Sequence, residues 1–357
     1  MSSDDRDLEL SILTRRLFRS MSFATDLKVP MFVPVYRKAF KRSPSSDVDV
    51  LGIRFDLDFE CTIAIAEAKS GEAKAVEELL KLSAVGDYLS ARKKYLVKPQ
   101  VHENAREIAR NLGLVCLSES ELTQLLNSTG ASGGPPTPKE LLYHRQQKAW
   151  FISMRRQKSS QQLANYLESE IWVRPYWENL NNLTYILRRF LANNAGRHPV
   201  YTEFAIFRTA SALSVSILHL CRQVMSSSLS SVGRAVELYI FGGPGARRQR
   251  ERLRDEIQKV VPSLKGLSIS MEPAFLGDLK EVVAYFILSP RDAIIAPQVF
   301  EDAISVVTNT DGKFKSDKWS YSHSPVAIKL AKDVLQFVLK SCGYTEQSKS
   351  FSEFLAL

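Results

Sequence analysis

Apolar and polar residues follow two different periods along the first 127 residues, and each period predicts one kind of element. Residues 3–20 repeat leucines at helical spacing, with acids in the first turn and arginines towards the end, which indicates a helix. Residues 47–53 and 63–68 are short and largely apolar, as expected of neighbouring strands inside a sheet that is covered on both faces. The further predicted elements are a strand at 31–36 limited by Pro30 and Pro34, a helix at 72–90 with Val76, Leu79, Leu80 and Val85 inward, a strand at 93–97, a helix at 102–112, a strand at 114–117 and a helix at 120–126.

This order of elements predicts an α/β domain with a mixed central sheet flanked by helices over residues 1–127. Residues 128–138 are rich in serine, glycine and proline, which predicts a linker. Helical periodicity dominates residues 139–357, so we predict a second, mostly α domain with a long irregular connection over residues 308–324.

The length and the apolar content agree with two domains. The chain has 357 residues, of which 45% are hydrophobic, and a single core rarely grows beyond about 300 residues. The longest uncharged apolar stretch of the second half, residues 209–221, is too short to cross a bilayer and predicts a buried helix. Without a basic and apolar leader, we expect a cytoplasmic protein that does not enter a membrane.

Several kinds of site are disfavoured by the spacing of residues. The four cysteines form no C-x-x-C pair and have no histidine at ligand spacing, so reduced core thiols are the expected state. The five histidines are dispersed and are expected to be structural. The glycines of residues 242–245 lack the lysine and hydroxyl of a phosphate loop, and predict a turn.

The positive charge is concentrated in the second half. The net charge is +9, and residues 1–130 carry 19 basic and 19 acidic residues, so the whole surplus lies beyond them. Arg247, Arg248 and Arg250 begin a basic helix after the glycine-rich turn and are candidates for contacts with nucleic-acid phosphates. The alternative is a solvated helix face paired with its own acids. Trp172, Tyr176 and Trp177 allow base stacking or core packing, and core packing is the more common role.

The candidate chemistry lies on the two apolar strands. Asp49 lies on the first strand, and Glu67 and Lys69, two residues apart, share one face of the second. Two carboxylates beside an ammonium group suit a Mg²⁺ site in which lysine positions water or helps to deprotonate it. Two alternatives remain. Glu67 and Lys69 could be an ordinary exposed pair without a catalytic role, or Asp47 rather than Asp49 could supply the aspartate of the site. Glu9, on the first helix, is a second-tier candidate ligand.

Residues 5–127 resemble the PD-(D/E)XK nuclease superfamily, whose members share the restriction-endonuclease-like fold. The resemblance rests on Asp49, on the run Glu67-Ala68-Lys69, and on the strand and helix-to-strand step that follow. It implies that Asp49, Glu67 and the backbone carbonyl of Ala68 bind Mg²⁺, with Mn²⁺ as a substitute, and that Lys69 orients the attacking water. Val48 stands where the family has proline, and the helix after the lysine lacks the Gln-x-x-x-Tyr motif of RecB-like exonucleases.

Three functions follow from these features. The first is a metal-dependent DNA endonuclease in phage defence, restriction or repair. Its helical domain would bind DNA, a protein partner or a second copy of the chain. The second is a catalytically inactive adaptor that retains the nuclease fold and binds nucleic acid or protein. The third is a nuclease that cleaves RNA, since water attacks phosphorus in the same way.

Overall fold

The structure is a computed structural model that describes residues 3–31, 46–71, 75–194, 199–261, 272–309 and 323–344, together with residues 351 and 354. The chain divides into two compact units. The first comprises Met1–Asp56, Cys61–Val173 and Glu301–Gly312, and the second comprises Leu57–Glu60, Arg174–Phe300 and Lys313–Leu357. The first unit therefore continues past residues 128–138 as far as Val173.

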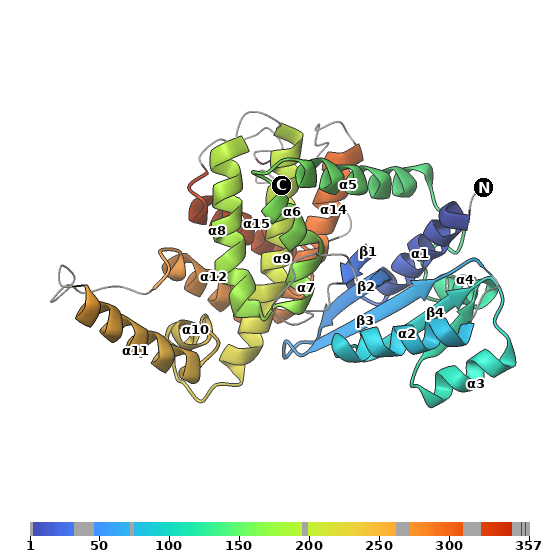
Figure 1. The fold of residues 1–357 in the computed structure, drawn as a ribbon, viewed down its shortest axis with the longest axis horizontal. Coiled ribbons are helices and arrows are strands. Elements are labelled where there is room, and N and C mark those ends of the chain that lie inside the picture. Colours follow the sequence, from blue (N-terminus) through green and yellow to red (C-terminus); the bar gives the residue numbers. More distant parts are fainter. Residues whose placement is uncertain are drawn as a thin grey trace. The chain divides into compact units, whose positions relative to one another are not determined.

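A five-stranded mixed sheet lies at the centre of the first unit (Figure 1). Its strands lie in the order in which they occur in the chain. The first three pair antiparallel, and the last two extend the sheet in parallel. The strands are β1 Ala24–Met31, β2 Ser46–Phe55, β3 Cys61–Ala68, β4 Lys93–Lys98 and β5 Val115–Ser118. The predicted α/β class and mixed sheet are confirmed.

Two layers of helices cover the sheet (Figure 1). α1 Ser3–Ser20 and α4 Glu119–Ser128 pack on one face, where their leucines meet Ala68, Val97 and Leu117. α2 Ala75–Tyr88 and α3 Glu103–Asn111 pack against β3, β4 and β5 on the other. Residues that alternate along β3 therefore face different helices, and Glu67 lies on the side of α2.

The first strand lies earlier in the chain than the sequence predicts. β1 runs from Ala24 to Met31, whereas the prediction began at Met31, and residues 32–36 lie outside the described residues. Val29 and Met31 are buried, but Asp26 and Lys28 interrupt the apolar pattern. The strand is therefore hard to recognise in the sequence because one of its faces is polar.

The predicted linker contacts α1 closely. Residues 129–137 form neither helix nor strand. The Arg16 guanidinium donates to the carbonyl oxygens of Ser132, Gly134 and Pro135, and its Nη2 lies 2.5 Å from Glu140 Oε2. These bonds fix the segment and the start of α5 Pro138–Arg156 on the first unit.

Glu140 makes the stability of this attachment depend on pH. Burial acts to raise the pKa of Glu140, but hydrogen bonds from Arg16 and Thr137 outweigh it and lower the pKa to about 2. An unfolded glutamate, with the ordinary pKa of 4.5, binds a proton first as the pH falls. The stabilisation is therefore complete above about pH 4.5 and is lost towards pH 2.

We expect this contribution to be about 1 to 2 kcal/mol after allowance for solvent screening. Urea unfolding at pH 6 and pH 3 measures it, with Glu140→Gln as the reference because glutamine keeps the helix cap but does not titrate. The wild type must lose more stability between the two pH values than the variant. Equal losses would contradict this role of Glu140.

The rest of the described chain is helical. The elements after α5 are α6 Gln161–Asn165, a π-helical turn Tyr166–Glu170, α7 Ile171–Val173, α8 Tyr176–Asn194, α9 Pro199–Met225, α10 Val232–Tyr239, α11 Pro244–Val260, α12 Leu276–Leu288, α13 Pro290–Ala293, α14 Ala296–Asn309 and α15 Pro325–Ser341. The mostly α second half is thus confirmed. The predicted irregular connection at 308–324 lies largely outside the described residues, and α14 includes its first two positions.

α9 is the central helix of the second unit, and α8, α10, α12 and α15 pack around it. Among the described residues, one segment, Tyr201–Met225, is long and apolar enough to cross a membrane, and 89% of its most apolar window is buried inside the protein. The buried helix predicted at residues 209–221 is confirmed. Cys221 on α9 is buried, as are Cys116 and Cys342, and all four cysteines are free thiols.

Candidate active site

The register of the antiparallel strands brings the predicted site residues together. Val50 of β2 pairs with Ala66 of β3, so one step further along the strands Asp49 stands opposite Glu67. Val50 and Ala66 belong to the cluster that packs against α1. Since side chains alternate along a strand, Asp49 and Glu67 both project from the opposite face.

Asp49 is fully buried, and both its oxygens accept hydrogen bonds. Oδ2 lies 2.8 Å from the backbone nitrogen of Ala68 and 3.2 Å from Lys69 Nζ. Oδ1 accepts a bond from Lys28 Nζ of β1. The carboxylate is therefore held in one orientation by three donors, two of them charged.

Glu67 is also buried, with 3% of its surface exposed, but it is less completely bonded. Its Oε1 lies 3.1 Å from Lys69 Nζ and 3.6 Å from Lys81 Nζ of α2. Neither approach satisfies hydrogen-bond geometry, so this oxygen is a buried acceptor without a hydrogen bond. Burial and then the charge of Asp49 raise the pKa of Glu67, against the opposing effects of Lys69 and Lys81.

Lys69 follows directly after β3 and lies between the two acids. Its backbone nitrogen donates to the carbonyl of Val97 at 3.0 Å, which fixes its position beside β4. Burial lowers its pKa, but Asp49 and Glu67 raise it more, so the net shift is upward. Lys69 is therefore a charged donor at neutral pH. In this state it can orient water or a phosphate oxygen but cannot accept a proton.

The donor set fits a hard divalent cation. Mg²⁺ is usually held by one or two carboxylates with water and substrate phosphate, and Asp49 and Glu67 are two buried carboxylates on one face. In the described part of the chain, no three side chains of His, Cys, Asp or Glu lie together as a metal cluster. The carboxylates that this face offers to such an ion are Asp49 and Glu67.

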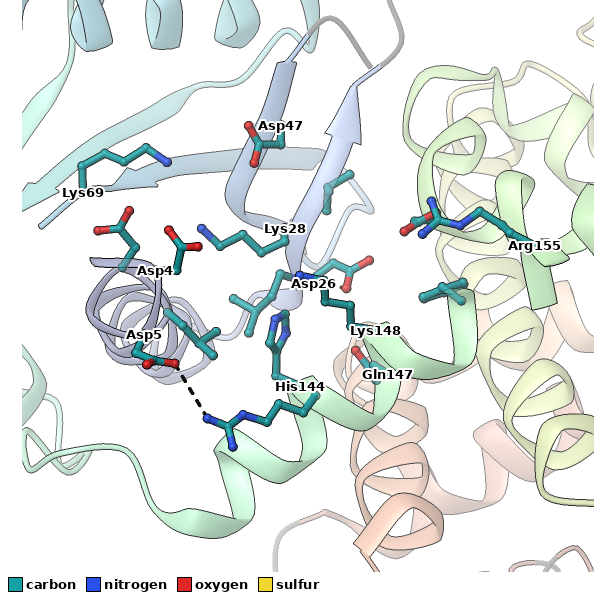
Figure 2. Close-up of a pocket in the computed structure, with 17 residues that line it drawn as sticks. Asp4, Asp5, Asp26, Lys28, Asp47, Lys69, His144, Gln147, Lys148 and Arg155 are labelled. Carbon is teal, nitrogen blue, oxygen red and sulfur yellow. Dashed lines mark hydrogen bonds and ion pairs between the residues drawn. The ribbon is translucent and has the colours of Figure 1, made fainter. Parts of the chain in front are cut away.

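A pocket of about 520 Å³ within the first unit is lined by Lys69, whereas Asp49 and Glu67 lie beneath its wall and do not line it (Figure 2). Lys28 and Lys69 line it with their ammonium groups pointing towards one another, and Asp47 lies nearby. His144 of α5 forms part of the wall. Burial and then several nearby cations, Lys148 and Lys28 among them, lower the pKa of His144 to about 4, so its imidazole is neutral at pH 7.

The two other acids considered from the sequence lie differently. Asp47 has a half-exposed side chain, 3.8 Å from Lys81, and lines the pocket. Glu9 pairs with Arg6 at 2.9 Å. Three acids of α1, Asp4, Asp5 and Asp7, line the same pocket, and Oδ1 of Asp7 accepts a bond of 2.6 Å from the backbone nitrogen of Ser70.

Sequence reasoning missed Asp7, Lys28 and Lys81. Asp7 was available as one of the acids in the first turns of the predicted helix, at a position two residues before Glu9. Lys81 was available as a lysine on the predicted helix after Lys69. Lys28 gave no signal, because its strand was predicted too late in the chain.

The basic residues predicted to contact nucleic acid lie on α11, which has no buried residue. Arg247 pairs with Glu251 at 3.1 Å, and Arg248 is exposed. The Arg250 guanidinium lies 3.4 Å from the centre of the Phe241 ring, and burial lowers its pKa. Arg250 is thus partly engaged within the protein, while Arg248 is accessible to a partner.

Two of the three aromatic residues considered for base stacking pack within the second unit. Tyr176 contacts Trp177 edge to face at 5.1 Å and stacks on His219 at 6.4 Å. Its hydroxyl donates to the carbonyl of Tyr239. These contacts agree with the core-packing interpretation.

The chain matches no protein-family model, no curated protein and no solved structure in the three comparisons.

Proposed function

We propose that the chain is a divalent-metal-dependent endonuclease that hydrolyses DNA, with its first unit as a PD-(D/E)XK domain of restriction-endonuclease-like fold. The observation that carries the proposal is the convergence of Asp49, Glu67 and Lys69 on one face of adjacent strands. Oε1 of Glu67 adds support, since it is buried and its contacts with Lys69 and Lys81 are ion pairs rather than well-directed hydrogen bonds. The order of one helix, three antiparallel strands and two parallel strands is compatible with the same family.

Each residue has a defined part in the proposed reaction. Mg²⁺, when bound, supplies an activated water and offsets negative charge on the phosphoryl oxygens. Asp49 and Glu67 hold the ion, and the fixed orientation of Asp49 lowers the cost of organising the site. Lys69 donates a hydrogen bond to the attacking water and stabilises charge that develops on phosphorus.

The test is a cleavage assay on supercoiled plasmid with Mg²⁺ or Mn²⁺. We expect the wild type to nick the plasmid in a metal-dependent manner, while Glu67→Ala and Lys69→Ala lose most of the activity. Glu103→Ala is the matched control, because Glu103 is an exposed glutamate of the same unit, paired with Arg110 at 2.6 Å. Nicking by all four proteins alike, or by none of them, would refute the enzyme.

An RNA substrate of matched sequence in the same assay distinguishes DNA from RNA cleavage. Faster hydrolysis of RNA would replace the proposed substrate but keep the site. We propose a cytoplasmic role in phage defence, restriction or repair, and binding of DNA, a protein or a second copy by the helical half.

A catalytically inactive adaptor is the second candidate, and one observation favours it. Lysine side chains and a backbone amide already neutralise and hold Asp49, so the folded site is stable without a metal ion. Binding of DNA without cleavage under every metal condition would select this function. The exposed basic helix α11 is the candidate surface for such binding.

A further inference from the structure

Lys28 is set apart by its place in the strand register and by its backbone conformation. On β1, Leu27 pairs with Val50 and Val29 with Val48, so Lys28 stands opposite Asp49. Its φ of 53° lies in the left-handed region, which is uncommon for a residue other than glycine. Such a conformation persists where the surroundings impose it, and it is concentrated at functional sites.

The ammonium group of Lys28 forms an ion pair with Oδ1 of Asp49. Asp49 is the residue that the proposed function assigns to the metal. The Lys28 side chain is 29% exposed and lines the pocket, whereas the Asp49 side chain is fully buried. Lys28 therefore approaches a metal-binding oxygen from the side that is open to solvent.

The two acids proposed to hold the metal are already paired with lysines before any metal binds, and Lys81 also pairs with Asp47. Within ion-pair distance of Asp49 and Glu67, the described residues include three ammonium groups, those of Lys28, Lys69 and Lys81. A divalent cation entering this set experiences repulsion from all three. Binding is easier if one ammonium group moves away.

Lys28 is the group best placed to move. Lys69 pairs with both acids and is fixed through its backbone to β4. Lys81 lies further from Glu67, at 3.6 Å, and does not contact Asp49 in the described ion pairs. Lys28 pairs with Asp49 through one oxygen, and its side chain can turn into the pocket.

We propose that Lys28 is a displaceable counter-ion that holds Asp49 until a divalent cation takes its place, and that the released ammonium group then binds a non-bridging oxygen of the substrate phosphodiester. This inference rests on the proposed nuclease function. It adds a second lysine, from β1, to the Lys69 of the motif. It also makes metal binding and phosphate binding coupled events, because the same side chain takes part in both.

The direct test is Mn²⁺ binding without nucleic acid, measured by titration calorimetry on the full chain. Lys28→Gly removes the ammonium group and places glycine where the backbone has a positive φ, so folding is retained. We expect Mn²⁺ to bind Lys28→Gly about tenfold more tightly than the wild type, since the competing ion pair is gone. General damage to the site would weaken binding, which is the opposite direction.

Two variants control for charge and for position. Lys28→Arg keeps a cation beside Asp49, and its Mn²⁺ affinity should stay at or below that of the wild type. Lys148→Met removes one exposed cation that lines the same pocket but is in no described ion pair with Asp49, and we expect a change within about twofold because solvent screens such charges. At saturating Mn²⁺, Lys28→Gly should cleave plasmid more slowly than the wild type.

Failure of this inference and failure of the proposed function give different results. A wild type that nicks plasmid, together with equal or weaker Mn²⁺ binding by Lys28→Gly, would overturn the role of Lys28 alone. Tighter binding by Lys28→Gly, in a protein that never nicks nucleic acid, would support the counter-ion and reject the nuclease.

Discussion

Asp49→Asn is expected to lower the rate of plasmid nicking about a thousandfold, because loss of a charged metal ligand removes several kcal/mol of transition-state stabilisation. Asp47→Asn, two residues away, is expected to retain most of the activity. The reason for the difference is the strand register, which places Asp49 opposite Glu67 and within 3.2 Å of Lys69 Nζ. Asp47 also lies on that face, but it is half exposed, next to Lys81.

The comparison uses single-turnover nicking rates at saturating Mg²⁺, with circular dichroism as the check on folding. Asparagine matches aspartate in size, so the variant keeps the packing of the buried site but loses its attraction for the cation and for both lysines. Comparable losses of nicking rate in the two variants would mean that Asp47 shares the role of metal ligand with Asp49. A larger loss with Asp47→Asn would transfer the role to that residue.

Glu301→Ala is expected to reduce the free energy of unfolding of the first unit by about 3 kcal/mol, because it leaves buried polar partners unsatisfied. Glu301 of α14 is 3% exposed. One of its oxygens accepts a bond of 2.5 Å from the backbone nitrogen of Thr25 on β1, and the other lies 3.6 Å from Arg15 Nη2. Burial raises the pKa of Glu301, while Arg19 and Arg15 lower it.

Thermal unfolding measures this effect, and a loss of about 3 kcal/mol corresponds to a fall in Tm of about 6 °C or more. Glu301→Gln is the matched control, because an amide oxygen can still accept the bond from Thr25 and fill the same volume. Its Tm should lie between those of the wild type and the alanine variant. An alanine variant as stable as the wild type would show that Thr25 and Arg15 find other partners.

The sequence predicted the central strands well because burial on both faces gives them an almost continuous apolar run. Ile63, Ile65 and Ala66 identified β3, and the strand period then placed Glu67 and Lys69 on one face. The register could not be read from the sequence, so the position of Asp49 opposite Glu67 came from the structure. The family resemblance, by contrast, stays a proposal.

The errors have specific physical causes. Val76 and Leu80, predicted to face inward, are 44% and 55% exposed, while Leu82 and Gly86 are buried. Gly86 packs against the Lys94 side chain, where an added Cβ would lie 2.7 Å from its carbon atoms. A pattern of apolar residues does not reveal a glycine that is buried because it makes room for the aliphatic part of a lysine. The buried face of α2 therefore differs from the predicted one by a rotation about the helix axis.

The strand order has a consequence for how the candidate site forms during folding. Lys28, Asp49 and Glu67 lie on three strands that are consecutive both in the chain and in the sheet. Pairing of neighbouring segments closes short loops and precedes long-range pairing in most folding reactions. The acids can therefore meet before β4 and β5 have joined the sheet. Their charges would then repel each other early in folding, and the lysines next to them would limit that repulsion before any metal ion is available.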